Sequence, residues 1–291
     1  IYPLVENAIY HGPTQGRDLL PSQIVEGAFD GTIETIEVDP SDNKKIYLGM
    51  APLVSYMSGG RGAPQQQAFL VATDDGGASW RKVTDLPGRS VLAIFPSALT
   101  GRLTVFTEKG CVVVNETSGE TETLPLPAAR ILDADGGVSS GGPLLYVLAP
   151  IRRNGDKLDG GVFRSSDGAK SWTAVNTGLL HDVPDGKVPR FRSMALCESR
   201  AEMLYLSSSN DRVARQDTTL WLYGVFKSEN AGDSWKPSWL ANGTGYLTEN
   251  FTQGWLDDEW GPGWGGNPIA LGVAPQNPDI CIGTDAGRSY K

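Results

Sequence analysis

Residues 250–267 bring flat aromatic side chains together with carboxylates in a glycine-rich stretch. Indole rings can stack on the faces of sugar rings, and carboxylates accept hydrogen bonds from sugar hydroxyl groups. The stretch therefore predicts a carbohydrate-binding loop, although one or two of the indoles could instead anchor the loop to the fold beneath it. The candidate substrate-binding residues of this loop are Trp255, Asp257, Asp258, Glu259, Trp260 and Trp264.

A further acid, Asp285, lies near the end of the sequence in CIGTDAGRSYK, residues 281–291. This stretch follows an apolar segment typical of a strand. Its Gly-Arg-Ser-Tyr-Lys lines up with the Gly-Val-Phe-Arg-Ser that begins at Gly161. Asp285 would then lie in the loop before a strand, where it is our candidate catalytic residue, with Arg288 as a candidate substrate-binding residue. The alternative is an aspartate that only shapes a tight turn.

These acids suit the hydrolysis of a glycosidic bond, which requires two carboxyl groups. An inverting enzyme holds the two groups roughly 6.5–9.5 Å apart. If Asp285 is one of them, the second must come from residues 257–259 or from sequence that is not present here. A different chemistry is also open, because His181 could serve as the base of a polysaccharide lyase. A histidine that is simply exposed to solvent is the alternative for His181.

The loops need a scaffold, and one stretch recurs three times along the chain. The copies are AFLVATDDGGASW (68–80), GGVFRSSDGAKSW (160–172) and YGVFKSENAGDSW (223–235). Each has a hydroxyl residue seven positions before the tryptophan, an Asp or Asn five positions before it, and a serine directly before it. Such side chains can hold a tight turn from within, while the tryptophan anchors the next strand. The predicted structural residues are Asp75, Trp80, Asp167, Trp172, Asn230 and Trp235.

A second sequence pattern, which we call the second phrase, lies upstream of these copies and consists of an alternating strand, a polar turn and a short apolar strand. Together the two phrases make a unit of four antiparallel strands, which we letter A to D, repeated every ~40–60 residues as in propeller blades. Residues 110–124 are interpreted as a degenerate copy of the Asp-containing turn that lacks the acid and the tryptophan. We therefore predict an all-β fold, a β-propeller with about four blades and part of a fifth. The second phrase occurs at 33–49, 91–106, 129–148, 191–207 and 268–283.

The S/T-x-D-x-G-x-x-W turns resemble the Asp-box, or BNR, repeats of sialidases, xyloglucan-cleaving glycoside hydrolases, Vps10/sortilin domains and several non-catalytic propellers. The resemblance covers residues 33–291 and departs from the pattern at Ala169, where a glycine is expected. The last stretch also resembles the T-D-x-G-G-x-Y-R motif of the xyloglucan hydrolases, in which the Asp is one of two catalytic carboxylates. Arg288 replaces the second glycine of that motif. The resemblance implies Asp-box turns on a β-propeller and does not by itself distinguish enzymes from binding proteins.

Strand direction separates the connections into two faces. The A–B turns and the Asp-containing C–D turns share one face, and the B–C loops and D–A connections share the other, which carries the long insertions. Long loops on one face of a rigid scaffold predict a binding face. Basic residues in these loops could meet an acidic sugar or merely contact solvent; they are Arg61, Arg152, Arg153, Lys157, Arg212 and Arg215. The long insertions are 50–67, 149–160, 176–190, 208–221 and 237–267.

The composition narrows the possible partners. A formal charge of -9 argues against nucleic acid or an anionic membrane as the main partner, and the sequence contains no apolar run long enough to span a bilayer. Cys111, Cys197 and Cys281 are widely spaced and form no C-x-x-C pair, so we expect buried free thiols and no metal site. No cofactor is expected.

These observations lead to one main hypothesis and two alternatives. We expect a secreted carbohydrate-active β-propeller, in the first place a glycoside hydrolase that cleaves a polysaccharide. The alternatives are a polysaccharide lyase on the same fold and a non-catalytic binding or assembly propeller. Residues 1–32 are expected to form an N-terminal segment that could supply a closing strand, with blades over 33–291. We also expect a second polypeptide or a C-terminal segment to complete the propeller.

Overall fold

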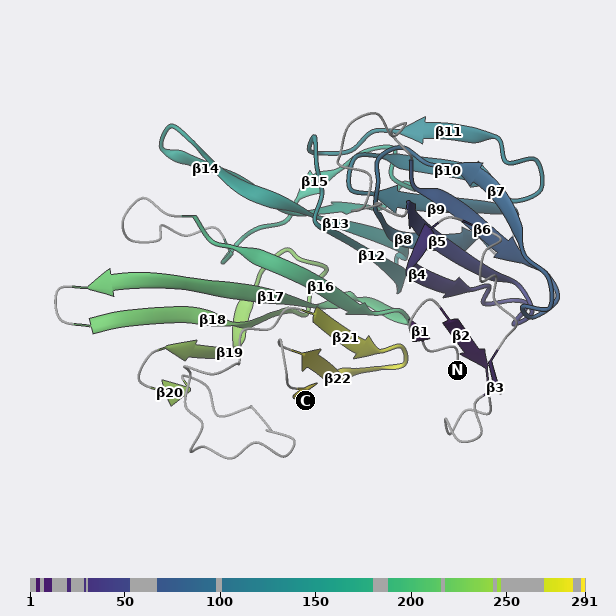
Figure 1. Cartoon of the computed structure of the whole chain (residues 1–291). Helices are drawn as coiled ribbons and strands as arrows, with labels where there is room; N and C mark the ends of the chain where they lie inside the picture. Colours follow the sequence, from purple (N-terminus) through teal and green to yellow (C-terminus); the bar gives the residue numbers. More distant parts are fainter. Residues whose placement is uncertain are drawn as a thin grey trace, which may run out of the picture. The chain divides into compact units, whose positions relative to one another are not determined.

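Among the residues that the computed structural model describes, all regular secondary structure is β-strand (Figure 1). The three-stranded sheet β1 (Leu4–Val5), β2 (Ala8–His11) and β3 (Leu20–Pro21) comes first in the chain. The residues that the structure describes are 4–5, 8–11, 20–21, 29, 31–52, 67–97, 101–179, 188–215, 218–242, 245–246, 270–284 and 289–290.

Two four-stranded sheets follow, each with its strands in chain order. Blade 1 consists of β4 (Gly31–Val38), β5 (Ile46–Pro52), β6 (Phe69–Thr73) and β7 (Arg81–Asp85). Blade 2 consists of β8 (Val91–Ser97), β9 (Arg102–Thr107), β10 (Cys111–Asn115) and β11 (Thr121–Leu124).

The second half of the chain repeats this pattern with longer strands. Blade 3 consists of β12 (Asp133–Ser139), β13 (Gly142–Asn154), β14 (Lys157–Ser165) and β15 (Thr173–Ala174). Blade 4 consists of β16 (Phe191–Cys197), β17 (Arg200–Arg215), β18 (Thr218–Ser228), β19 (Lys236–Asn242) and β20 (Gly245–Tyr246). A last sheet consists of β21 (Ala270–Ala274), β22 (Asn277–Thr284) and β23 (Ser289–Tyr290).

Each strand of blades 1 to 4 pairs antiparallel with its neighbour in sequence, as the alternating phrases predicted. The fold is a β-propeller with four such blades, so the predicted fold class is confirmed. The chain divides into two compact units, residues 1–124 and 125–291. The boundary predicted at residue 32 remains a prediction.

The core of the first unit lies between blades 1 and 2. Alternate residues of β5 and β6 turn toward blade 2, among them Tyr47 and Leu70, and pack against Ile94 and Val105. The intervening residues, such as Leu48, form a second buried cluster on the other face of blade 1. Such alternation is what a strand that is buried on both faces requires.

The core of the second unit lies between blades 3 and 4. Leu148 and Val162 of blade 3 pack with Leu206 of blade 4, and all three are fully buried. Phe191 and Phe226 join them in an edge-to-face pair with ring centres 6.0 Å apart. This packing gives the strands of blade 3 a rigid base from which their outer ends project.

Two insertions that we predicted as loops are strands. Residues 149–160 continue β13 and β14 as a hairpin, and residues 208–221 continue β17 and β18 in the same way. The polar and charged residues at these hairpin ends produced the wrong prediction. A register shift between Ala149 and Arg152 lets the blade 3 pairing continue beyond the core.

Candidate functional site

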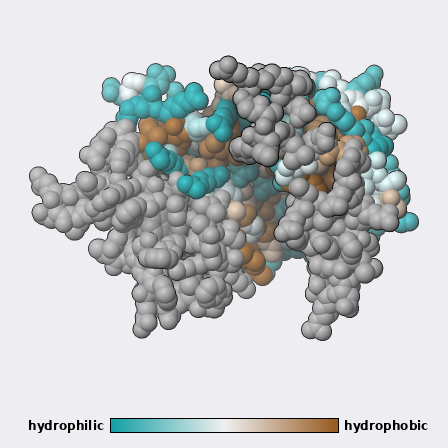
Figure 2. Space-filling model, viewed as in Figure 1, coloured by the Kyte–Doolittle hydropathy of each residue, from teal (hydrophilic) through white to brown (hydrophobic). Residues whose placement is uncertain are grey.

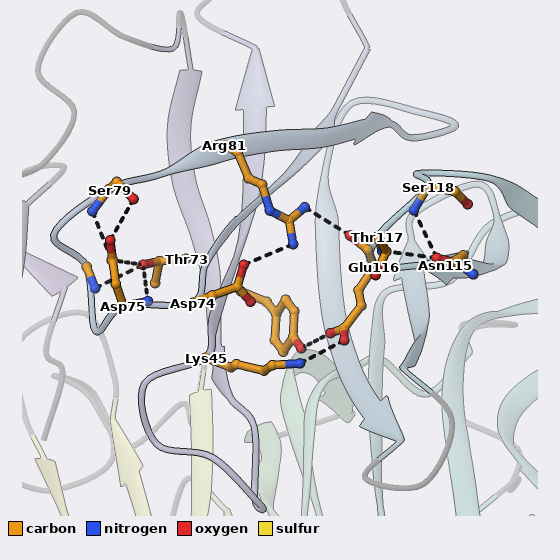
Figure 3. Close-up of polar contacts among 12 residues, drawn as sticks. Lys45, Thr73, Asp74, Asp75, Ser79, Arg81, Asn115, Glu116, Thr117 and Ser118 are labelled. Atoms are coloured by element: carbon orange, nitrogen blue, oxygen red, sulfur yellow. Dashed lines mark hydrogen bonds and ion pairs between the residues drawn. The ribbon is translucent and has the colours of Figure 1, made fainter.

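The turn between β6 and β7 is held together by two side chains, Thr73 and Asp75 (Figure 3). The hydroxyl oxygen of Thr73 accepts a hydrogen bond from the backbone N–H of Gly77 at 3.0 Å, and its hydroxyl donates to Asp75 Oδ1 at 2.7 Å. Asp75 also accepts from the backbone N–H and the hydroxyl of Ser79, at 2.9 and 2.6 Å. Hydrogen bonds from Ser79 lower the pKa of Asp75, so its carboxylate is ionised and used within the turn.

The turn between β14 and β15 repeats these contacts. Ser165 Oγ accepts from the backbone N–H of Ala169 at 2.9 Å. Asp167 accepts from the backbone N–H and the hydroxyl of Ser171 at 2.9 and 2.5 Å. The hydrogen bond from the Ser171 hydroxyl is the main cause that lowers the pKa of Asp167 to about 2. Asp167 therefore shapes a turn and has no proton to give at neutral pH.

In the third turn, between β18 and β19, Asn230 takes the place of the aspartate. Its Oδ1 accepts from the backbone N–H of Ser234 at 2.9 Å, and its Nδ2 donates to Ser234 Oγ at 2.9 Å. The amide therefore reverses one hydrogen bond and keeps the turn. We call the three segments 73–80, 165–172 and 228–235 the Asp turns.

Each Asp turn places two consecutive residues in the left-handed region of the backbone. In the second Asp turn they are Gly168 and Ala169, with φ of 73° and 67°. The expected glycine is therefore replaced by an alanine that adopts the same conformation at a steric cost. In the third turn the alanine comes first, as Ala231, and is followed by Gly232.

The Asp turns lie on the same face as the A–B turns, as strand direction predicted. The backbone N–H of Gly76 donates to the carbonyl of Lys44 at 2.9 Å in blade 1. In blade 4 the backbone N–H of Ala231 donates to the carbonyl of Glu202 at 2.9 Å. These contacts join the two kinds of turn within a blade, so any site on the other face must be built from B–C hairpins and D–A connections.

A groove of about 670 Å³ lies at that other end of blade 3. One side is the connection that leads into blade 3, residues 127–130, and the other is the projecting end of the β13–β14 hairpin. Phe163, Ala174 and Asn176 complete the lining. A D–A connection and a B–C hairpin thus share one concave surface, which is our candidate functional site.

The bend of the hairpin depends on Gly160 and Gly161, which both have positive φ, at 100° and 84°. A Cβ at Gly160 would collide with the carbonyl of Pro150, and a Cβ at Gly161 would collide with the side chain of Asn176. Asn176 in turn donates from Nδ2 to the carbonyl of Gly160 at 3.0 Å and accepts from the N–H of Val162 at 2.7 Å. This amide fixes the base of the groove by completing hydrogen bonds of the hairpin backbone.

The groove is basic in an acidic chain. Among the described residues, its lining contains Arg130, Arg152 and Arg153 against one carboxylate, Asp159, which gives a formal net charge of +2. The whole sequence carries -9. Asp159 accepts a hydrogen bond from Asn154 Nδ2 at 3.3 Å. Figure 2 shows hydrophilic residues gathered over the free end of the hairpin.

No protein-family description matches this sequence, and no curated protein matches it. Among solved structures, the chain resembles a GH74 enzyme of Niastella koreensis with a TM-score of 0.61 and 15% identity, over 97% of this chain and 40% of that chain. It resembles an ancestral GH74 enzyme with a TM-score of 0.53 and 14% identity, over 97% and 32% of the two chains. The tricorn protease follows with a TM-score of 0.45, 13% identity, and 78% and 20% coverage.

Both GH74 similarities are similarities of fold. At 15% and 14% identity they agree with the β-propeller described above, and both neighbours are carbohydrate-active enzymes. The chain spans 40% and 32% of their lengths. The likeness to the tricorn protease is too low to bear on fold or function.

Most of the predicted substrate-binding and catalytic residues lie outside the part of the chain that the structure describes. Arg212 and Arg215 fall in β17, and nothing further is described of their side chains. Arg152 and Arg153 lie in the candidate groove. The predicted residues outside the described part are Arg61, His181, Trp255, Asp257, Asp258, Glu259, Trp260, Trp264, Asp285 and Arg288.

Other chemistry-bearing side chains in the described ranges have structural roles. Cys111 and Cys197 are buried and Cys281 is half-buried, all as free thiols, and burial raises the pKa of Cys111 and of Cys281 to about 12. Within those ranges, no group of three or more His, Cys, Asp or Glu residues is arranged to hold a metal ion. Likewise, none of the described segments forms a helix that could cross a membrane.

Tyr47 and Glu116 form a tyrosine–carboxylate pair of the kind that can generate a nucleophile, and its environment argues against that role (Figure 3). The Tyr47 hydroxyl donates to Glu116 Oε2, while Lys45 Nζ contacts Glu116 Oε1 at 2.8 Å. Tyr47 is 1% exposed, and burial raises its pKa further above the usual range. The pair is therefore a latch between blades 1 and 2 on the Asp-turn face.

The same strand position carries a tyrosine latch in two more blades, a feature that our sequence reasoning missed. Tyr146 donates to the carbonyl of Ala201 at 2.9 Å, and Tyr205 donates to the carbonyl of Pro278 at 2.7 Å. Each bond joins one sheet to the next. The recurring Ile/Leu-Tyr-Leu/Val in the second strand of these blades was the available signal.

Proposed function

We propose that this chain is part of a secreted carbohydrate-active enzyme that cleaves a polysaccharide on the face formed by B–C hairpins and D–A connections. The observation that carries the proposal is the groove beside the β13–β14 hairpin. Its volume of about 670 Å³ falls within the range of ligand sites in proteins, roughly 300–1,000 Å³. It lies at the opposite end of blade 3 from the Asp turn 165–172, whose polar groups are used within the turn.

The lining of the groove suits a sugar. Leu158 and Phe163 supply apolar surface for the C–H faces of sugar rings. Asn154 and the three arginines supply hydrogen-bond donors for hydroxyl groups. The structural likeness to two carbohydrate-active propeller enzymes supports the same general kind of ligand.

Catalysis is assigned to Asp285, with binding by Arg288 and by the loop that carries Trp255, Trp260 and Trp264. The second carboxylate would come from residues 257–259 or from a further segment. We also propose that the Asp turns are Asp-box repeats, which their shared hydrogen bonds and sequence pattern support. A second polypeptide or a further segment would supply the remaining blades.

A non-catalytic carbohydrate-binding propeller is the second candidate. The described lining of the groove contains one carboxylate, Asp159, where glycoside hydrolysis needs two carboxyl groups. This observation favours binding without cleavage if the segments that carry Asp285 and residues 257–259 do not approach the groove.

Cleavage of a panel of neutral and acidic polysaccharides by wild type and by Asp285→Asn separates the candidates. An enzyme that uses Asp285 as acid or base should lose at least about a hundredfold in rate in the variant. Asp279→Asn is the matched control, because Asp279 lies near the start of β22 and is exposed. Equal cleavage by Asp285→Asn and wild type would remove Asp285 from the mechanism. Binding without cleavage by the wild type would favour the binding protein.

A further inference from the structure

We propose that the groove beside the β13–β14 hairpin selects a sugar that carries an anionic substituent, a carboxylate or a sulfate. This inference rests on the proposed function, since it names the substrate class of the same groove. It is carried by three arginines that line one concave surface with a single aspartate.

Two of the arginines are available to a ligand. Arg130 and Arg152 are exposed, and neither makes a hydrogen bond or ion pair within the described part of the chain. By contrast, the exposed Arg102 contacts Glu122 at 2.8 Å, and the half-buried Arg164 contacts Asp233 at 2.9 Å. Unpaired guanidinium groups that share a groove are well suited to bind a planar carboxylate or a sulfate through charge-assisted hydrogen bonds.

The one carboxylate of the lining does not cancel this charge. Asp159 lies opposite Arg152 in the backbone register of the hairpin. The Asp159 carboxylate accepts a hydrogen bond from Asn154. Arg130 approaches the groove from the separate connection at 127–130, and Arg153 from the strand position next to Arg152. The excess positive charge is therefore spread along the groove instead of being confined to one ion pair.

The backbone holds the two sides in place. Asn176 bonds to Gly160 and Val162 at the base of the hairpin, and Trp172 Nε1 donates to the carbonyl of Pro125 at 2.9 Å near the start of the connection. A groove with fixed walls loses little conformational entropy when a ligand enters. The formal charge of -9 on the sequence disfavours nucleic acid, which carries a phosphate on every nucleotide, whereas the one or two charged sugar units that occupy the groove interact mainly with the local lining.

The test compares three oligosaccharides of equal length by calorimetry with the whole chain: a neutral glucan, a glucuronate oligosaccharide and a sulfated galactan. The wild type should bind at least one anionic oligosaccharide more tightly than the neutral one, and its affinity should fall as salt rises. Arg130→Gln and Arg152→Gln should each weaken anionic binding about three- to fivefold, and the double variant about tenfold or more.

Arg200→Gln is the matched control, because Arg200 lies at the A–B turn of blade 4 in the same unit. It should bind as the wild type does, and thermal unfolding should show that all variants fold. The anionic oligosaccharide that binds more tightly identifies the substituent. Tight neutral binding that the arginine variants do not change would overturn this inference and leave the proposed function standing. Binding of none of the three oligosaccharides would count against both.

Discussion

The carboxylate of Asp135 accepts a hydrogen bond from the backbone N–H of Leu196 at 2.9 Å, which joins the first strand of blade 3 to the first strand of blade 4. Two residues earlier, Asp133 accepts from the backbone N–H of Met194 at 2.8 Å. Both carboxylates also accept from the backbone N–H of the residue that follows them. Two acids thus link the neighbouring first strands in addition to the side-chain packing of the core between blades 3 and 4.

This link should make the chain less stable as the pH rises. Burial raises the pKa of Asp135 to about 8 and that of Asp133 to about 6, above the ordinary value of 3.8. The folded state therefore binds more protons than the unfolded state between pH 4 and 8, and the free energy of unfolding falls through that window. One such group gives a slope of at most about 1.4 kcal/mol per pH unit. Urea unfolding from pH 4 to 9 measures the slope.

Asp135→Asn removes the titration and keeps an oxygen that can accept from Leu196. Its unfolding free energy should depend less steeply on pH than that of the wild type. Asp159→Asn serves as the control, because Asp159 lies on the exposed hairpin of the same blade. Identical slopes for wild type and Asp135→Asn would show that Asp135 does not titrate in this window.

The second Asp turn should tolerate an amide better than a methyl group. Asn230 already holds the equivalent turn of blade 4, accepting from the backbone N–H of Ser234 at 2.9 Å. Asp167→Asn should therefore lower the melting temperature less than Asp167→Ala, which leaves the N–H of Ser171 without its acceptor. Scanning calorimetry of both variants decides this. The prediction is wrong if the two substitutions lower the melting temperature equally.

The Asp turns were predictable from the sequence because their bonds are local. Thr73, Asp75 and Ser79 lie within seven residues, so side-chain types and spacing specify the hydrogen bonds. The strands between them follow from alternation, and the order of strands fixes which connections share a face.

The links between blades were not predictable in the same way. Asp133 and Met194 are separated by 61 residues and meet through a backbone N–H, which leaves no trace in the partner's residue type. The hairpin end at 149–160 looked like a loop because charge marks solvent exposure and not strand geometry. Arg152 and Arg153 were expected on the binding face, whereas Arg130 joins them only because the fold brings its connection alongside.

Two tryptophans of the Asp turns should respond differently to phenylalanine. Trp235 is 4% exposed, and its Nε1 donates to the carbonyl of Val175 at 2.8 Å. The Nε1 of Trp80 is buried and has no hydrogen-bond partner among the described residues. Trp80→Phe and Trp235→Phe both lose buried apolar area, but only Trp235→Phe breaks a buried hydrogen bond. Trp235→Phe should therefore lower the free energy of unfolding by about 1–2 kcal/mol more than Trp80→Phe. Urea unfolding that gives equal losses would contradict the assignment.

The tyrosine latches should differ in strength according to the group that accepts the hydrogen bond from the tyrosine hydroxyl. Tyr47→Phe removes a hydrogen bond to the ionised Glu116. Burial alone would raise the pKa of Glu116, but the hydrogen bonds from Lys45 and Tyr47 outweigh burial and lower it. Tyr205→Phe removes a bond to the neutral carbonyl of Pro278. Bonds to charged groups contribute about 1.5–3 kcal/mol against about 1 kcal/mol for neutral pairs, so Tyr47→Phe should be the more destabilising change.

The pH dependence gives this comparison a second readout. Without the Tyr47 hydroxyl, the pKa of Glu116 should rise toward its ordinary value. A carboxyl whose folded pKa is lowered stabilises the chain above its unfolded pKa and loses that effect as the pH falls, so the Tyr47→Phe deficit should shrink in acid. The Tyr205→Phe deficit should stay constant, because no ionisable acceptor is involved. Parallel loss of both deficits below pH 4 would mean that Glu116 is not the group that strengthens the blade 1 latch.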